Sequence, residues 1–270
     1  MINSKYDWQF HEVNDTTQVD QLAKDAGIDP FIATMLVQRG VKTADEAETF
    51  MNPTVSSFHD PFLMHDMKKG VDRISQAVES GEHITVYGDY DADGITSTTI
   101  MYETLSDLGA DVDYYIPNRF SEGYGPNVAA FQSIIDKGTS LIVTVDNGVA
   151  GNDAIAAANQ LKCDVVVTDH HSLPEVLPDA FAIIHPRVKD ADGNAYPFGD
   201  LCGAGVAFKV AQALMDDVPS DLLDIAAIGT VADIVSLRDE NRAIVKFGVQ
   251  AIKNSQRPGL IALIKEAGID

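Results

Sequence analysis

The chain has 270 residues, 45% of them hydrophobic and 22% charged, which is typical of a soluble globular protein with one or two domains. Its formal net charge of −22 argues against non-specific nucleic-acid binding through a broad basic surface. It does not exclude an enzyme that takes a nucleic-acid end into a cleft filled with divalent ions. The chain shows no membrane-length apolar run and no signal-peptide core. Cys163 and Cys202 form no metal pattern, so we expect a reduced, cytoplasmic location.

Residues 1–60 are predicted to form a small helical arm. Pro30 begins one helix of this arm, because proline is favoured at the first helical position. Thr43 and Glu46 have the spacing of a capping box for a second helix. Asn52-Pro53 is predicted to end that second helix.

Residues 61–235 are predicted to form an α/β domain. Asp66 is placed to cap a helix that runs to Ser80. The predicted strands are 84–87, 111–116, 141–145, 165–167 and 182–184, and the predicted helices between and after them are 94–108, 128–137, 153–161 and 222–231. Apolar strands that alternate with helices indicate a mostly parallel sheet with helices on both faces. Residues 236–270 are predicted to be a helical linker.

The stretch from His83 to Gly94 is predicted to be a short buried strand that is followed directly by three aspartates. Asp89, Asp91 and Asp93 lie so close together that they need a compensating cation unless they are fully solvated. Oxygen ligands favour Mg²⁺ or Mn²⁺. The spacing also matches half of an EF-hand loop, but Ile100 stands where that loop needs a glutamate. A solvated acidic turn is the alternative for this stretch alone.

Other strands of the predicted sheet end in similar residues. The additional candidates are Asp146 after 141–145, Asp169, His170 and His171 after 165–167, and His185 after 182–184. Ligands of a parallel sheet bind at the carboxyl ends of its strands, so we expect these side chains to share one crevice. Separately, each could be a helix cap, a surface residue or a core histidine. Together they predict a metal centre, with Mn²⁺ favoured over Mg²⁺ by the imidazoles and two ions favoured by the number of ligands.

Three motifs make the sequence resemble the DHH phosphoesterase superfamily. They are Asp89-Tyr90-Asp91-Ala92-Asp93-Gly94, Asp146-Asn147-Gly148 and Asp169-His170-His171. The loop 116–125 and the stretch 201–208 resemble the branch of that superfamily that degrades single-stranded DNA from the 5′ end. The resemblance runs from Trp8 to at least Asp233. It implies a metal-dependent 5′→3′ exonuclease of DNA repair and recombination, in which activated water attacks the phosphodiester.

The resemblance also implies individual roles. Asp91 and Asp93 each hold one ion, Asp146 bridges both, and His170 is a ligand. His171 is a ligand or contacts the scissile phosphate. Asp233 matches the last ligand motif, although the residues alone suggest an ordinary helix-end aspartate. Many members have a metal-binding histidine where this chain has Tyr87, so Asp89 or water is expected to substitute.

Two segments are predicted to bind substrate phosphate. Arg119 is the candidate clamp, with a solvated loop arginine as the alternative. Gly203 and Gly205 precede an apolar helix, so their backbone N–H groups are placed to receive a phosphate. The alternative for these glycines is tight helix–sheet packing. His185 is predicted to support a ligand rather than to bind metal.

The resemblance further implies that residues 236–270 lead to a second substrate-binding domain and an OB-type fold, so we expect the chain to be a catalytic fragment. Single-stranded DNA is the expected partner, and the continuing chain is expected to contact a single-strand-binding protein or a helicase. Two other functions are considered. One is a phosphodiesterase of the same superfamily that acts on short oligoribonucleotides or cyclic dinucleotides. The other is a non-catalytic DNA-binding scaffold, a class that usually loses the metal ligands this chain retains.

Overall fold

A computed structural model of the chain describes residues 16–269. It divides into two compact units, one ending at Ser57 and one beginning at Phe58. The predicted limits of the arm (1–60), the α/β domain (61–235) and the linker (236–270) remain predictions. Residues 1–15 of the predicted arm lie outside the described part.

The first unit is a small helical unit. It contains α1 (Thr16–Ala26), α2 (Pro30–Gln38), α3 (Ala44–Met51) and the 3-10 turn η1 (Val55–Ser57). Pro30 begins α2, and Thr43 and Glu46 form the predicted capping box of α3. The apolar faces of the helices enclose one core, made of Val19, Leu22, Ala33, Leu36, Val41 and Ala47.

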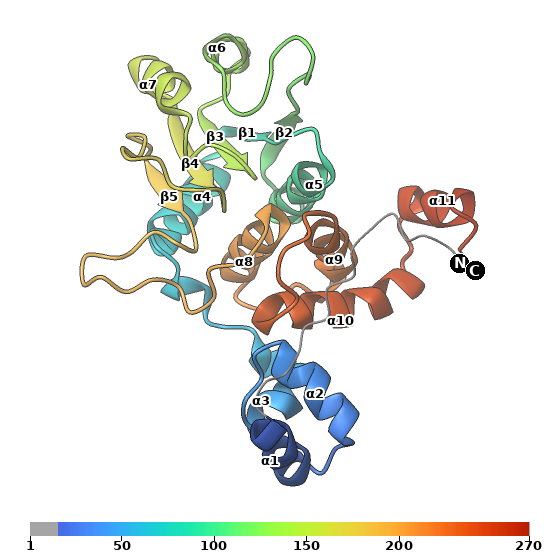
Figure 1. Ribbon diagram of the computed structural model, residues 1–270. Helices are drawn as coiled ribbons and strands as arrows, with labels where there is room; N and C mark the ends of the chain where they lie inside the picture. Colours follow the sequence, from blue (N-terminus) through green and yellow to red (C-terminus); the bar gives the residue numbers. More distant parts are fainter. Residues whose placement is uncertain (1–15, 270) are drawn as a thin grey trace, which may run out of the picture. The chain divides into compact units, whose positions relative to one another are not determined.

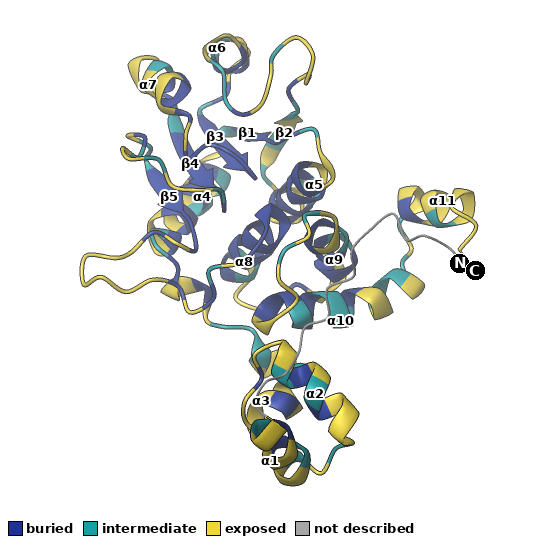
Figure 2. Ribbon diagram, viewed as in Figure 1, coloured by how far each residue is buried: buried dark blue, intermediate teal, exposed yellow. Residues whose placement is uncertain are grey.

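The second unit is built on a five-stranded parallel sheet (Figure 1). Its strands are β1 (His83–Tyr87), β2 (Asp111–Tyr115), β3 (Leu141–Val145), β4 (Asp164–Thr168) and β5 (Ala182–Ile184). Every residue of β3 is buried, because helices cover the sheet on both faces (Figure 2). The predicted α/β class with a parallel sheet is confirmed.

Alternate side chains of the strands enter two separate cores. On one face, Ile84, Leu141 and Val143 pack in the core that includes α4 (Met67–Ser80), α5 (Ala92–Asp107) and α8 (Gly203–Met215). On the other face, Ile142 and Val165 pack under α6 (Val128–Ile135) and α7 (Asn152–Gln160). The remaining elements are the 3-10 turns η2 (Pro61–Leu63) and η3 (Ser220–Leu222) and the helices α9 (Leu223–Ala232), α10 (Asp239–Lys253) and α11 (Pro258–Glu266).

The strand order β2-β1-β3-β4-β5 creates a crevice at the carboxyl ends of the sheet. The chain moves to one side of β1 to form β2 and then returns to form β3 on the other side. Ligand sites of open α/β sheets lie at such a reversal. The loops after β1 and β3, which carry the acidic motifs, therefore meet there.

The prediction that Asp66 caps α4 is wrong. Asp66 does precede the helix, but its backbone is left-handed, with φ of 52°, and its side chain makes no capping bond. Its Oδ2 instead accepts a hydrogen bond from the N–H of Ile183, 3.1 Å away. The carboxylate thus satisfies a donor of the edge strand β5. Separately, among residues 16–269 no helix has the length and apolarity needed to cross a membrane.

Candidate metal centre

The loop after β1 supplies the first carboxylates. Asp91 caps α5, because its Oδ1 accepts a hydrogen bond from the N–H of Gly94 at 2.9 Å. Asp89 is buried beneath this turn. Gly94 allows the approach, since an added β-carbon would lie 2.6 Å from the Asp89 Cβ and 2.7 Å from its backbone oxygen.

The loop after β3 turns Asp146 into the crevice. Asp146 has a left-handed backbone, with φ of 61°, a conformation that aspartate tolerates better than most residues. Its neighbour Asn147 donates side-chain hydrogen bonds to the carbonyls of Gly88 (3.0 Å) and Val145 (2.9 Å). The ends of β1 and β3 are thereby tied together beside the carboxylates.

The turn after β4 is held by Asp169. Its Oδ1 accepts from the backbone N–H groups of His170 (2.7 Å) and His171 (3.0 Å) and lies 2.8 Å from His171 Nδ1. Its Oδ2 accepts from the N–H of Val149. Burial raises the pKa of Asp169, but these hydrogen bonds outweigh burial and hold it below its ordinary value. The hydrogen bond to Asp169 raises the pKa of His171. Asp169 therefore holds the turn that carries both histidines and orients the ring of His171.

These three loops and the end of α9 bring seven predicted ligands together. The side chains form three overlapping groups in which the ligand atoms lie within 4.8 Å of one another: Asp146–His170–His171, Asp93–His170–Asp233 and Asp89–Asp91–Asp146. Asp146 and His170 each belong to two groups. Such overlap is the arrangement that two neighbouring ions with shared ligands require.

The nitrogen and oxygen atoms of the centre are arranged to bind a cation rather than to hydrogen-bond to one another. His170 Nε2 lies 3.1 Å from Asp146 Oδ1, but neither atom has a hydrogen-bond partner among the described residues, and both are buried. Both side-chain oxygens of Asp89 are likewise buried without a partner within residues 16–269. Unpaired buried acceptors are costly. A divalent ion held by oxygen and nitrogen would satisfy them.

The charges of the centre point the same way. Burial and the adjacent Asp93 raise the pKa of Asp146 to about 10. Burial and Asp93 also raise the pKa of Asp233. In the metal-free chain these carboxylates therefore resist ionisation together, and a cation would relieve that cost.

The prediction that Gly203 and Gly205 offer N–H groups to a phosphate is not supported by their contacts. The N–H groups of Gly203 and Ala204 donate to the two oxygens of Asp93, at 2.6 and 2.8 Å. The N–H of Gly205 donates to the Cys202 sulfur at 3.4 Å. The amino end of α8 thus binds a carboxylate of the protein, which its N–H groups and dipole stabilise.

The loop between β2 and α6 places Arg119 and Tyr124 at the centre. The Arg119 guanidinium lies 4.7 Å from the centre of the Tyr90 ring. Tyr90 stands between Asp89 and Asp91 in the sequence. The Tyr124 hydroxyl donates to the Asp146 carbonyl (3.1 Å) and lies 3.1 Å from the ring nitrogens of His171. Our sequence interpretation assigned no role to Tyr124. The signals were its place between two glycines and within the loop 116–125, which resembles the DNA-degrading branch of the superfamily.

Two other predicted positions lie outside the ligand groups. Tyr87 is buried in the core under α6, where its hydroxyl donates to the Gly125 carbonyl and its ring stacks on Tyr115. His185 Nδ1 accepts from the N–H of Arg187, so Nε2 carries the proton and donates to the His171 carbonyl. His185 therefore supports the backbone of a candidate ligand.

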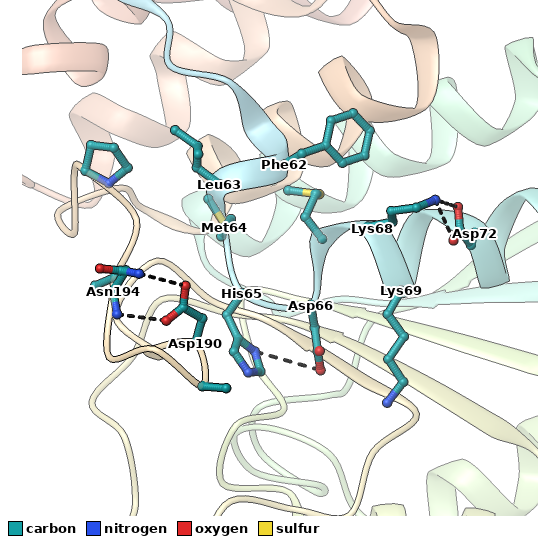
Figure 3. A pocket seen from close by; sticks show the side chains of 14 residues that line it. Phe62, Leu63, Met64, His65, Asp66, Lys68, Lys69, Asp72, Asp190 and Asn194 are labelled. Carbon is teal, nitrogen blue, oxygen red and sulfur yellow. Dashed lines mark hydrogen bonds and ion pairs between the residues drawn. The ribbon is translucent and has the colours of Figure 1, made fainter.

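A large cavity lies apart from this centre. Its volume is about 880 Å³, and it is lined by η2, the start of α4 and the loop around Asp190 and Asn194 (Figure 3). None of its lining residues belongs to the three ligand groups. Its size alone does not make it the reactive site, because it lacks the buried, unpaired oxygen and nitrogen atoms that lie close together in the metal centre.

The fold and site define an α/β domain with a metal-type cluster of carboxylates and imidazoles at the topological switch of a parallel sheet. The family description "DHH family, N-terminal domain" matches residues 83–230, which include six of the seven candidate ligands. The chain belongs to the DHH family.

Individual relatives narrow the comparison. The chain is 48% identical to the single-stranded-DNA-specific exonuclease RecJ of Bacillus subtilis (strain 168) over 270 residues, all of this chain and 34% of the relative. The structure of RecJ from Thermus thermophilus in complex with Mn²⁺ matches 96% of this chain and 37% of that one, with 28% identity and a TM-score of 0.79. A structure of exonuclease RecJ bound to manganese matches 76% of this chain and 52% of that one, with 34% identity and a TM-score of 0.69. The chain therefore spans about a third to a half of the length of these relatives.

Proposed function

We propose that this chain carries the catalytic centre of a divalent-metal-dependent exonuclease that hydrolyses single-stranded DNA from its 5′ end. The observation that carries the proposal is the overlap of three ligand groups at Asp146 and His170, with buried donor atoms that lack partners among the described residues. The similarity to RecJ supports the choice of substrate.

The proposed ligands divide between two ions, Mn²⁺ or Mg²⁺. Asp91 and Asp93 would each hold one ion, Asp146 would serve both, and His170, Asp233 and Asp89 would complete the set. His171 binds an ion or the scissile phosphate. Two ions bound there would lower the pKa of a water molecule and offset the charge of the phosphate.

The residues of the chain hold this set in place. Asp169 and His185 fix the turn that carries the two histidines, through its backbone and ring nitrogens. The amino end of α8 fixes Asp93. Such pre-set geometry matters because small displacements of catalytic groups have large effects on rate.

Arg119 is proposed to bind a substrate phosphate. Its guanidinium is already held over Tyr90, next to the carboxylates of the same motif. Arginine offers a planar pair of donors that matches phosphate. A positive charge beside these carboxylates would also favour entry of the negatively charged strand at this point.

Digestion of single strands labelled at either end tests the proposal. With Mn²⁺ we expect the 5′ label to be released first as a small product, while 3′-labelled strands shorten gradually. EDTA should stop the reaction, and a matched duplex should resist it. Release from the 3′ end, equal attack on the duplex, or a preference for cyclic dinucleotides would contradict the proposal.

A further inference from the structure

Phe120 has the largest exposed fraction among the exposed large hydrophobic side chains of residues 16–269, at 93%. Single exposed apolar residues are common on protein surfaces and need no explanation. The position of Phe120 is what sets it apart. It directly follows Arg119 in the loop that reaches the candidate metal centre.

The loop around Phe120 has a fixed backbone. Asn118 Oδ1 accepts hydrogen bonds from the N–H groups of Phe120 (3.0 Å) and Ser121 (3.2 Å). Glu122 accepts from the N–H of Asn118 at 2.8 Å, and the N–H of Glu122 donates to the Asn118 carbonyl at 2.8 Å. The Tyr115 hydroxyl also donates to Glu122. Phe120 is therefore presented to solvent by an ordered turn.

Both sides of this turn are tied to the metal centre. Arg119 lies over Tyr90, between two candidate ligands in the sequence. Tyr124 donates to the backbone of Asp146. A strand whose phosphate reaches the centre would therefore pass beside the turn that carries Phe120.

We propose that Phe120 is a stacking platform for an unpaired nucleobase, an inference that rests on the proposed function of the chain. Every base has a π face, so an aromatic ring can bind a strand without reading its sequence. The bases inside a duplex have both faces covered by their neighbours. A pre-formed platform thus favours single strands, and little ordering cost is paid on binding.

Fluorescence of Phe120→Trp tests stacking directly. Trp8 is the only natural tryptophan, so the unchanged chain measures its background. We expect a short oligothymidylate to quench the added emission in the presence of Ca²⁺, an ion that fills oxygen sites with flexible geometry. Anisotropy of a labelled oligonucleotide measures binding in the same samples. Binding without quenching of the added indole would overturn the inference.

A second experiment pairs Phe120→Ala with abasic nucleotides. Each of the first few bases of a single strand is removed in turn, and Kd and KM are measured. We expect Phe120→Ala to weaken binding about ten-fold, and the loss to vanish at the one position where the base is already absent. Phe120→Leu should recover part of the affinity through apolar contact alone.

Phe62→Ala is the matched control. Phe62 is another exposed phenylalanine, but it lines the separate cavity shown in Figure 3. We expect its removal to leave both measurements unchanged. An equal loss from Phe62→Ala, or a loss from Phe120→Ala that persists at every abasic position, would contradict the inference. Quenching without any hydrolysis would keep the inference and reject the exonuclease. Absence of any binding to single strands would reject both.

Discussion

Gly203 packs directly against the side chain of Asp146. A β-carbon added to Gly203 would lie 2.5 Å from the Cβ and Oδ1 atoms of Asp146, which is closer than such atoms can approach. The N–H of the same glycine donates to Asp93 at 2.6 Å. The first turn of α8 therefore sets the positions of two carboxylates, although it contributes no ligand of its own.

We predict that Gly203→Ala disrupts the metal centre. The methyl group must push Asp146 aside, and a displacement near 1 Å lowers the rate of an aligned reaction about 100-fold. Hydrolysis and Mn²⁺ affinity should both fall, while circular dichroism should show a folded chain.

Gly259→Ala is the control for that change. Gly259 lies in the first turn of α11, and nothing would stand within 4 Å of its added β-carbon. Full activity of the Gly203 variant would show that α8 does not set the geometry of the centre.

We predict that Asp146→Ala abolishes hydrolysis and leaves the fold intact. The substitution removes the one carboxylate that is proposed to serve both ions. It also removes a buried group that resists ionisation, which offsets the strain of alanine in the left-handed backbone of this position, so the chelated variant should melt close to the chelated parent. Thermal unfolding in EDTA and a turnover assay in Mn²⁺ measure the two effects. Near-normal turnover would reject the proposed role of Asp146.

Metal binding should release protons. Burial and Asp93 raise the pKa of Asp146 to about 10, so this carboxyl is protonated near neutral pH in the metal-free chain. A divalent ion must displace that proton, and higher pH removes the competitor. The affinity for Mg²⁺ should therefore rise by up to about ten-fold per pH unit between about pH 6 and 8.

The raised pKa of Asp146 has the opposite effect on the stability of the metal-free fold, which falls as the pH rises. A carboxyl whose folded-state pKa is raised stabilises the fold at low pH and loses that contribution as the pH rises toward about 10.

Calorimetry of Mg²⁺ binding in buffers of different ionisation enthalpy counts the released protons, and Asp146→Asn should lower that count. A Mg²⁺ affinity that is independent of pH would contradict this account.

Arg119→Ala is expected to raise KM on single-stranded DNA about ten-fold without changing the Mn²⁺ content. The variant removes a pair of donors but no ligand. Arg119→Lys should recover only part of the loss, because an ammonium group cannot bind phosphate with a planar pair. If KM is unchanged over a range of salt concentrations, Arg119 is an ordinary solvated residue.

The strand ends of this site were predictable from the sequence. Asp89, Asp146 and His170 each follow an apolar strand, and parallel strands must bring such residues to one edge of the sheet. The pattern also predicted the sheet class and the capping box at Thr43.

The partners of those side chains were not predictable. The packing of α8 beside α5 decides which acceptor the amino end of α8 binds. The sequence does not show this packing, so it predicted a phosphate at Gly203 and Gly205 where the structure has Asp93. Tyr124 reaches His171 only through the path of a long loop. Asp66 matched the sequence pattern of a cap, yet the paired edge strand supplied a competing donor. Packing between elements decided each of these cases.

The most direct test of the central claim is an anomalous diffraction map of crystals grown with Mn²⁺. The account predicts two peaks, both within bonding distance of Asp146, with His170, Asp93 and Asp233 around them. A single peak that Asp146 does not touch, or no peak within the three ligand groups, would contradict it.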